Sequence, residues 1–307
     1  MKIPKRSAFT LIELLVVIAI IALLLSVILP ALRSAKNQAK LVVCMAHEKQ
    51  IVLALQAFQS SNGDYPESVG ANMLRDEKTP RWWDSPEMMA MNLGTAGGNP
   101  NLRDGGYISE ILGGYIDSPD VWFCPLSLMQ PDTPLTGQTG VTRSTSQVFY
   151  DADSVEFPFV RWSYAAFWKY GGFATYSDTS CVVNLPPYYG PGLRDDPSIL
   201  KPGSRGKLML TDVLKAYGNK VNRWASNHPF KESEKVYMDS VAYYMKDLTD
   251  ETYFSVDQNL VGPIVADEVG KIKLNAAFED GSVERYTGNE GIRQASRNRY
   301  FVLPSWN

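Results

Sequence analysis

Glu13 is the side chain whose type and position first require a chemical explanation. It lies near the start of an apolar run from Phe9 to Leu29, and an ionised carboxylate inside hydrocarbon is costly on membrane-insertion scales. A buried acid is tolerated when an opposite charge pairs with it. The position therefore predicts an ionic partner for Glu13. The alternative is a carboxylate that reaches back to the interface from an ordinary membrane anchor.

Other reactive side chains are sparse. His47 and His228 are the two histidines and lie far apart in the sequence. No Cys/His group has the spacing of a zinc site. No phosphate-binding glycine loop, dinucleotide fingerprint or Gly-x-Ser-x-Gly nucleophile is present. We therefore expect no catalytic residue, no cofactor and no metal, and we expect His47 to be a surface or packing residue. Acids at 151–153 and 195–196 could bind calcium through oxygen ligands, but solvated turns are the simpler interpretation.

The apolar run must be carried by a helix. About 20 apolar residues in helical form cross a hydrocarbon core, and Phe9–Leu29 supplies 21. The small residue that could mark a cleavage site, Ala8, precedes the run, so a cut there keeps the apolar segment on the mature protein. Pro30 predicts a kink or, alternatively, a helix end. Helix-forming residues continue beyond it until Asn62–Gly63, a typical stop signal.

The continuation of this helix should pack under a globular domain. One helix over residues 9–61 would be roughly 80 Å long, with its first half in a membrane or a filament core. The helical period predicts a buried face on the second half. Its predicted members are Ala35, Ala39, Val42, Val43, Ala46, Leu53, Ala57 and Phe58.

The remaining chain is typical of a folded domain of strands and loops. Roughly 240 residues suffice for a core, and Asp280–Gly281 predicts the turn of a hairpin. The predicted fold class is α+β, with the long N-terminal helix packed on a C-terminal antiparallel sheet domain that has large loop insertions. Strands are predicted from β-branched and aromatic content at Gln147–Tyr150, Phe159–Trp168, Lys207–Thr211, Lys273–Phe278 and Ser282–Tyr286.

Charge and aromatic content narrow the possible partners. The formal net charge of −3 argues against a nucleic-acid surface. Aromatic side chains are dense and would bind polysaccharide or a partner if exposed, although a place in the core is the commoner outcome. They are Trp82, Trp83, Trp162, Phe167, Trp168, Tyr170, Tyr188, Tyr189, Tyr243 and Tyr244.

The segment Ser7-Ala-Phe-Thr-Leu-Ile-Glu-Leu-Leu-Val-Val-Ile-Ala-Ile20 resembles the N-terminal signature of type IV pilins and type II secretion pseudopilins. The resemblance implies that a prepilin peptidase cuts between Ala8 and Phe9 on the cytoplasmic face and that Phe9 is then N-methylated. It also implies that Glu13 pairs with the N-terminal amine of a neighbouring subunit. A proline kink is common in this family at the position of Pro30. The family usually has Gly before the cut, where this chain has Ala8.

Three further regions resemble a large pilin-like group of planctomycete and lentisphaera-type bacteria. The last motif of that group usually has a histidine where this chain has Ser282, and a second histidine that often precedes the asparagine is missing. The matches support the pilin-like fold, while the missing histidines weaken the case for a shared chemical site. The matching stretches are Cys44–Phe58 with Asn62–Pro66, Val121–Pro125, and Lys207–Asp212 with Asn275–Val283.

The cysteines allow two interpretations. The orientation implied by the resemblance places the globular part outside the cytoplasmic membrane, where disulfides persist. A Cys44–Cys124 bridge would tie the helix to the domain, close a loop of about 80 residues, stabilise the fold by up to roughly 4 kcal/mol and leave Cys181 over. The alternative is three buried thiols that act as small hydrophobes.

The predicted protein is a non-enzymatic structural subunit of a type IV pilus-like or type II secretion pseudopilus filament. Its expected partners are the prepilin peptidase/methyltransferase and other pilin-like subunits. It would span the bacterial inner membrane once, with the N-terminus cytoplasmic and the domain periplasmic or extracellular. The alternative is a surface polysaccharide receptor or adhesin on the same anchor; a tethered hydrolase has no motif in its favour. The predicted parts are a leader (1–8), an assembly helix (9–29), an exposed helix (30–61) and a globular domain (62–307).

Overall fold

The computed structural model of the chain has two compact units, Met1–Val42 and Val43–Asn307. Ala8, Phe9 and Cys181 lie outside the residues that it describes, as do the acids at 151–153 and 195–196. The described residues are 10–66, 88–91, 111–136, 142–150, 159–168, 208–217, 223–229, 234–238, 241–247, 270–296 and 299–304.

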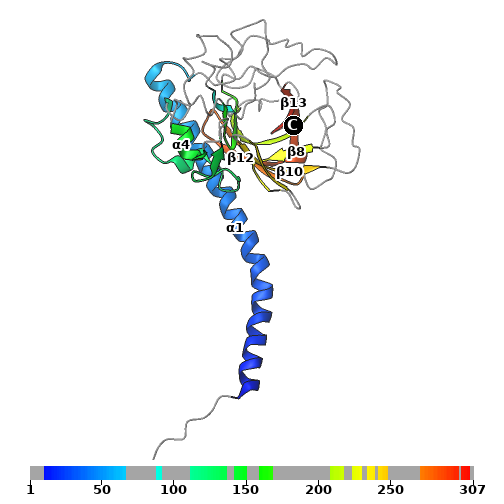
Figure 1. Cartoon of the computed structure of the whole chain (residues 1–307). Coiled ribbons are helices and arrows are strands. Elements are labelled where there is room, and N and C mark those ends of the chain that lie inside the picture. Colours follow the sequence, from blue (N-terminus) through cyan, green and yellow to red (C-terminus); the bar gives the residue numbers. More distant parts are fainter. Residues whose placement is uncertain are drawn as a thin grey trace, which may run out of the picture. The chain divides into compact units, whose positions relative to one another are not determined.

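Helix α1 runs without a break from Leu11 to Asn62 (Figure 1). It continues through Pro30, so the alternative of a helix that ends at the proline is wrong. The helix stops where the sequence predicts. Gly63 follows with φ +84°, the left-handed conformation that glycine adopts most easily after a helix, and its N–H donates to the Gln59 carbonyl at 2.7 Å.

In the first unit, α1 presents a continuous apolar surface. Its large apolar side chains from Leu11 to Leu32 are exposed, with fractions of 46% at Val17 and 78% at Leu11. Exposed apolar surface of this extent marks a membrane or a protein partner. By length and composition, α1 is able to cross a membrane.

In the second unit, one face of α1 is buried, but it is not the predicted face. Val43, Ala46 and Leu53 are exposed, so that prediction is wrong. The buried residues recur every three or four positions, as a packed helix face requires, and two of them are not aliphatic, which hid the register from a search for apolar residues. This face consists of Cys44, Glu48, Ile51, Val52 and Leu55, all at 0% exposure.

The described strands form antiparallel sheets. The two larger sheets have the strand orders β12–β11–β6–β5 and β13–β14–β7–β8–β10–β9, and β1–β4 and β2–β3 are separate pairs. The strands are β1 (Met88–Met91), β2 (Pro134–Thr136), β3 (Thr142–Ser144), β4 (Phe159–Arg161), β5 (Tyr164–Ala166), β6 (Leu208–Asp212), β7 (Leu214–Tyr217), β8 (Arg223–Ser226), β9 (Glu234–Met238), β10 (Val241–Asp247), β11 (Lys273–Phe278), β12 (Val283–Thr287), β13 (Gly291–Ser296) and β14 (Arg299–Pro304). The short helices are η3 (Pro119–Trp122), α4 (Thr145–Tyr150) and η4 (Gly288–Glu290).

One predicted strand is a helix. Residues 147–150 lie in α4, and the reason is a capping box, in which an N-cap side chain and the side chain three residues later satisfy each other's backbone N–H groups. The N–H of Ser144 donates to Gln147 Oε1 at 2.9 Å, and the N–H of Gln147 donates to Ser144 Oγ at 3.3 Å. The predicted strands at Lys207–Thr211, Lys273–Phe278 and Ser282–Tyr286 are confirmed as β6, β11 and β12. The region Phe159–Trp168, predicted as one strand, contains two strands, β4 and β5, that belong to different sheets.

The predicted hairpin is confirmed, and its turn contacts the C-terminal part of the long helix. β11 pairs with β12, and between them Gly281 has φ +79°. The Ser282 N–H donates to Asp280 Oδ1 at 2.8 Å, which closes the turn. The side-chain amide of Gln56 on α1 donates to the Glu279 carbonyl in this turn. The C-terminal part of α1 therefore packs on the four-stranded sheet, as the α+β fold class requires.

Four aromatic side chains of the predicted set are buried in the core, and Tyr244 is half-buried. Trp162 lies among other buried aromatic rings. Its ring centroid is 5.9 Å from that of Trp122, 5.7 Å from that of Tyr164 and 6.3 Å from that of Trp168. Phe167 and Tyr243 are buried as well. The core interpretation is thus confirmed for Trp162, Phe167, Trp168 and Tyr243. The predicted aromatics Trp82, Trp83, Tyr170, Tyr188 and Tyr189 lie outside the described residues.

Candidate functional site

Glu13 closes the first turn of α1 together with Thr10. Its Oε2 accepts hydrogen bonds from the Thr10 N–H at 2.9 Å and from the Thr10 hydroxyl at 2.8 Å, and its own N–H donates to Thr10 Oγ1 at 3.2 Å. This is a capping box at the helix start. The pattern Thr-x-x-Glu could have been found in the sequence and was missed there. Glu13 thus has a local role in starting α1, and its ionic partner stays a prediction.

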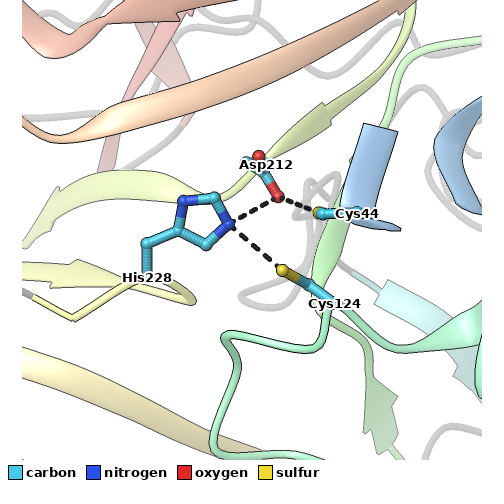
Figure 2. A group of neighbouring side chains, drawn as sticks. All are labelled: Cys44, Cys124, Asp212 and His228. Carbon is cyan, nitrogen blue, oxygen red and sulfur yellow. Dashed lines mark hydrogen bonds and ion pairs between the residues drawn. The ribbon is translucent and has the colours of Figure 1, made fainter. Parts of the chain in front are cut away.

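A second group of reactive side chains lies in the globular unit, where four residues from different segments converge (Figure 2). Cys44 is on α1, Cys124 follows η3, Asp212 is the last residue of β6, and His228 comes just after β8. The two sulfurs, a carboxylate oxygen and an imidazole nitrogen all lie within 4.8 Å of one another. We call these four residues the buried cluster, because none is more than 2% exposed.

Asp212 makes the central contacts of the buried cluster. Its Oδ1 accepts a hydrogen bond from the Cys44 thiol at 3.2 Å and lies 3.1 Å from His228 Nε2. The same Nε2 lies 3.1 Å from Cys124 Sγ. The Cys44 sulfur is also 3.7 Å from the Tyr164 hydroxyl. Two thiols, a carboxylate and an imidazole therefore form one continuous set of polar contacts.

Backbone groups fix the orientation of the acid and the imidazole. His228 Nδ1 lies 2.6 Å from the Lys273 carbonyl, and since a carbonyl only accepts, Nδ1 carries the proton and donates it. Asp212 Oδ2 accepts the Asn275 N–H at 2.8 Å. The ring is thereby held with Nε2 toward the buried cluster and Nδ1 toward the strand, an arrangement typical of histidines that bind metals.

Asn227 joins the two segments that supply Asp212 and His228. Its Nδ2 donates to Asp212 Oδ1 at 2.9 Å, and its Oδ1 accepts the Val213 N–H at 3.0 Å. Its own N–H donates to the Val213 carbonyl at 3.2 Å. Val213 is the residue at which the chain leaves β6 in one sheet and enters β7 in the other. The buried cluster therefore lies where the two larger sheets meet in the chain.

A compact turn after η3 holds Cys124. The Cys124 carbonyl accepts hydrogen bonds from the Ser127 N–H at 2.8 Å and from the Gln130 side-chain amide at 3.0 Å. The same amide donates to the Ser127 carbonyl at 2.9 Å. The Cys-Pro sequence thus places a thiol on a fixed turn rather than on a loose loop.

Burial and charge set the protonation of the buried cluster as it stands. Burial raises the pKa of both thiols, that of Cys44 well above its usual value. Burial alone would lower the pKa of His228, but the charge and hydrogen bond of Asp212 outweigh it and raise that pKa well above the ordinary value. Burial would raise the Asp212 pKa, and His228 together with the Asn227 and Asn275 hydrogen bonds lowers it. These directions favour an Asp212–His228 ion pair beside two neutral thiols.

Glu48 adds a fifth polar side chain to this region. It lies one helical turn after Cys44 on the same face of α1 and is fully buried. Neither carboxylate oxygen has a hydrogen-bond partner among the described residues. Burial raises its pKa well above the usual value, and the charge of nearby Asp212 raises it further. Such a group requires an explanation, because an unsatisfied buried carboxyl destabilises a fold.

The sequence expectations for these residues had mixed outcomes. The structure brings Cys44 and Cys124 together as thiols, and the disulfide stays a prediction. The sequence spacing did not indicate that Asp212 and His228 join the two cysteines, because Cys44 and Asp212 are 168 positions apart and Cys124 and His228 are 104 apart. His47 Nδ1 lies 3.0 Å from the Phe123 carbonyl, which is the packing role expected of it.

Comparison with known proteins finds similarity in the N-terminal segment. The prokaryotic N-terminal methylation motif matches residues 3–29. The type II secretion system core protein G of Pseudomonas aeruginosa is 37% identical over 62 residues. The N-terminal segment of this chain is pilin-like. The matched region covers 20% of this chain and 44% of the secretion protein, so less than half of that relative's length is represented. No solved structure matches the chain.

The chain thus has two separate places where its side chains could act. Glu13 and the exposed apolar surface of α1 fall within residues 3–29, the span of the methylation motif. Three members of the buried cluster, Cys124, Asp212 and His228, come from the second unit beyond α1. The first place is available for assembly in a membrane, and the second is enclosed by the globular fold.

Proposed function

We propose that this chain is a non-enzymatic structural subunit of a type II secretion pseudopilus or a type IV pilus-like filament. The observation that carries the proposal is the coincidence of the methylation motif at residues 3–29 with the exposed apolar part of α1. A helix of this kind would anchor the subunit in the inner membrane before assembly. It can then exchange its lipid contacts for contacts with the same helix in neighbouring subunits, since both surroundings are apolar.

Processing prepares the segment for assembly. A prepilin peptidase would cut between Ala8 and Phe9 and methylate the new amine, so that the mature chain begins four residues before Glu13. The carboxylate would then meet the amine of a neighbouring subunit, and the pairing would set the axial register of the filament, because an unpaired charge in this apolar region is costly. Mass spectrometry of the assembled protein should find an N-methylated Phe9, and a strain without the peptidase should retain residues 1–8.

Glu13 has two roles that a pair of substitutions separates. Glu13→Gln keeps the capping box, since glutamine also accepts the Thr10 hydrogen bonds, but removes the charge. Thr10→Ala keeps the charge and removes the cap. We expect Glu13→Gln to be inserted into the membrane in normal amount and to form no filaments in electron micrographs. Thr10→Ala should still assemble.

The opposite pattern would contradict the proposal. Normal filaments from Glu13→Gln would show that the charge has no part in assembly, and a loss of filaments in Thr10→Ala alone would assign Glu13 a capping role only. The surface-receptor alternative gains no support from Trp162, Trp168 and Tyr243, because these three aromatic side chains are core. Glycan binding by a protein that forms no filaments would revive that alternative.

A further inference from the structure

We propose that the buried cluster, Cys44, Cys124, Asp212 and His228, is a structural zinc site of the globular unit. Its donors are two sulfurs, one imidazole nitrogen and one carboxylate oxygen. Thiolate and imidazole ligands in a four-coordinate arrangement are the chemistry that Zn²⁺ prefers in proteins. This inference does not depend on the proposed filament function, since the site lies outside residues 3–29.

The distances fit a tetrahedral ion with small adjustments. Zinc bonds of about 2.0–2.3 Å place neighbouring ligand atoms of a tetrahedron about 3.3–3.8 Å apart. The contacts between Asp212 and Cys44, between Asp212 and His228, and between His228 and Cys124 are 3.2, 3.1 and 3.1 Å. The remaining pairs of donor atoms lie within 4.8 Å, so side-chain shifts of up to about 1 Å would bring all four donors to tetrahedral distances.

The surrounding hydrogen bonds have the pattern that a metal site requires. With the Nδ1 proton donated to the Lys273 carbonyl, the Nε2 lone pair of His228 is available to a metal once the proton shared with Asp212 leaves. Asp212 Oδ2 accepts the Asn275 N–H, and Oδ1, which also accepts the Asn227 side-chain amide, faces the site. Such second-layer bonds fix ligand orientation and raise ligand basicity.

A bound cation would also stabilise ionised acids in this region. With zinc bound, the two thiolates and Asp212 would carry three negative charges in a volume enclosed by protein, near Glu48, whose carboxylate oxygens have no hydrogen-bond partner among the described residues. Zn²⁺ would neutralise most of that charge. On binding, Cys44, Cys124 and His228 each release one proton, and four protein–metal bonds form.

The site is structural rather than catalytic. All four ligands are buried, and four protein donors complete a tetrahedron, whereas catalytic zinc keeps one position for water or substrate. The ion would join α1, the turn after η3 and both larger sheets. A Cys44–Cys124 disulfide would tie α1 to the same turn, but it would leave the convergence of Asp212, His228 and Glu48 without a reason.

The test begins with the full chain, purified in detergent with a thiol reductant and without chelator. Elemental analysis should find about one zinc per chain. X-ray absorption at the zinc edge should show two sulfur and two nitrogen or oxygen neighbours, and replacement by Co²⁺ should give the visible bands of a tetrahedral thiolate complex. These measurements use the wild-type chain, so they do not depend on the folding of any variant.

Variants then assign the ligands. His228→Gln and Cys124→Ser should each lose at least tenfold in zinc affinity in a chelator competition. His47→Gln and Cys181→Ser, which change the other histidine and the third cysteine, should bind as the wild type does. Three outcomes would overturn the proposal: a reduced wild-type chain that binds no added zinc, a native chain with Cys44 and Cys124 already joined in a disulfide, or a His228→Gln variant with unchanged zinc affinity.

Discussion

Two carboxylates of this chain illustrate how position decides the role of a residue. Glu13 is exposed on the first turn of α1, where its side-chain bonds among the described residues are with Thr10. Asp212 is 1% exposed, and His228, Asn227 and Asn275 surround it. Removing one partner from a buried ionic group costs far more than removing an exposed contact, because the remaining charge is left without solvent.

Asn227 should therefore be a stability determinant although it is no ligand. Asn227→Ala removes the bonds to Asp212 and to the Val213 N–H, and we expect it to lower the free energy of unfolding by about 1–3 kcal/mol. The matched control is Asn62→Ala, which removes an exposed side-chain bond to the Phe58 carbonyl and should change stability by less than about 0.5 kcal/mol. Thermal unfolding followed by circular dichroism compares the two, and equal effects would contradict the assigned role.

At the scale of elements, a local hydrogen-bond pattern outweighs composition at one place. Aromatic and β-branched content predicts a strand at residues 147–150, yet the Ser144–Gln147 capping box starts a helix there. The hairpin at Asp280–Gly281 was predictable because its turn residues fix the backbone locally. The six-stranded sheet had no such signal, and its strand β7 even buries a lysine, Lys215, whose Nζ lies 4.1 Å above the Tyr243 ring.

The hairpin turn offers a test at this scale. Gly281 has φ +79°, and a Cβ there costs about 1–2 kcal/mol in backbone strain. Gly281→Ala should lower the free energy of unfolding by about that amount, and the Cβ itself meets nothing closer than Leu53 at 3.9 Å. Gly114→Ala is the control, because its Cβ meets no atom within 4 Å and its φ is not positive. Denaturant unfolding should leave that control unchanged or slightly more stable, and a neutral Gly281→Ala would refute the turn assignment.

At the scale of the whole molecule, one helix serves two different units. Its N-terminal part presents apolar side chains that need a membrane or neighbouring subunits, and its C-terminal part supplies Cys44 and Glu48 to the folded unit. The apolar segment and the prepilin-type motif indicate a membrane-anchored protein. In the proposed filament, the same helix would connect assembly in the membrane to a domain held together by its own core.

The proposed orientation can be tested with reporter fusions. Alkaline phosphatase is active only outside the cytoplasm, so a fusion after Asn307 should be active, and a fusion after Ala8 should be inactive. Protease added to spheroplasts should digest the domain in the first strain. An inactive Asn307 fusion in a strain that makes the full-length protein would place the domain in the cytoplasm and remove the filament proposal.

The sequence by itself determined what depends on neighbours along the chain. The apolar run, the helix stop at Gly63, the hairpin at Gly281 and the N-terminal motif each arise from interactions within a few residues or from the solvent that a segment requires. These features were sufficient to predict an α+β, pilin-like chain with an N-terminal assembly helix.

Only the tertiary structure decided which side chains meet. The buried face of α1 follows from what the sheets cover, and this placed Cys44 and Glu48 inside while Leu53 stayed exposed. Asp212 contacts Cys44 across 168 positions of the chain, and His228 lies beside Cys124 across 104 positions. No local pattern encodes such contacts, because they depend on how the sheets and the helix pack together, and the candidate metal site exists only in the folded domain.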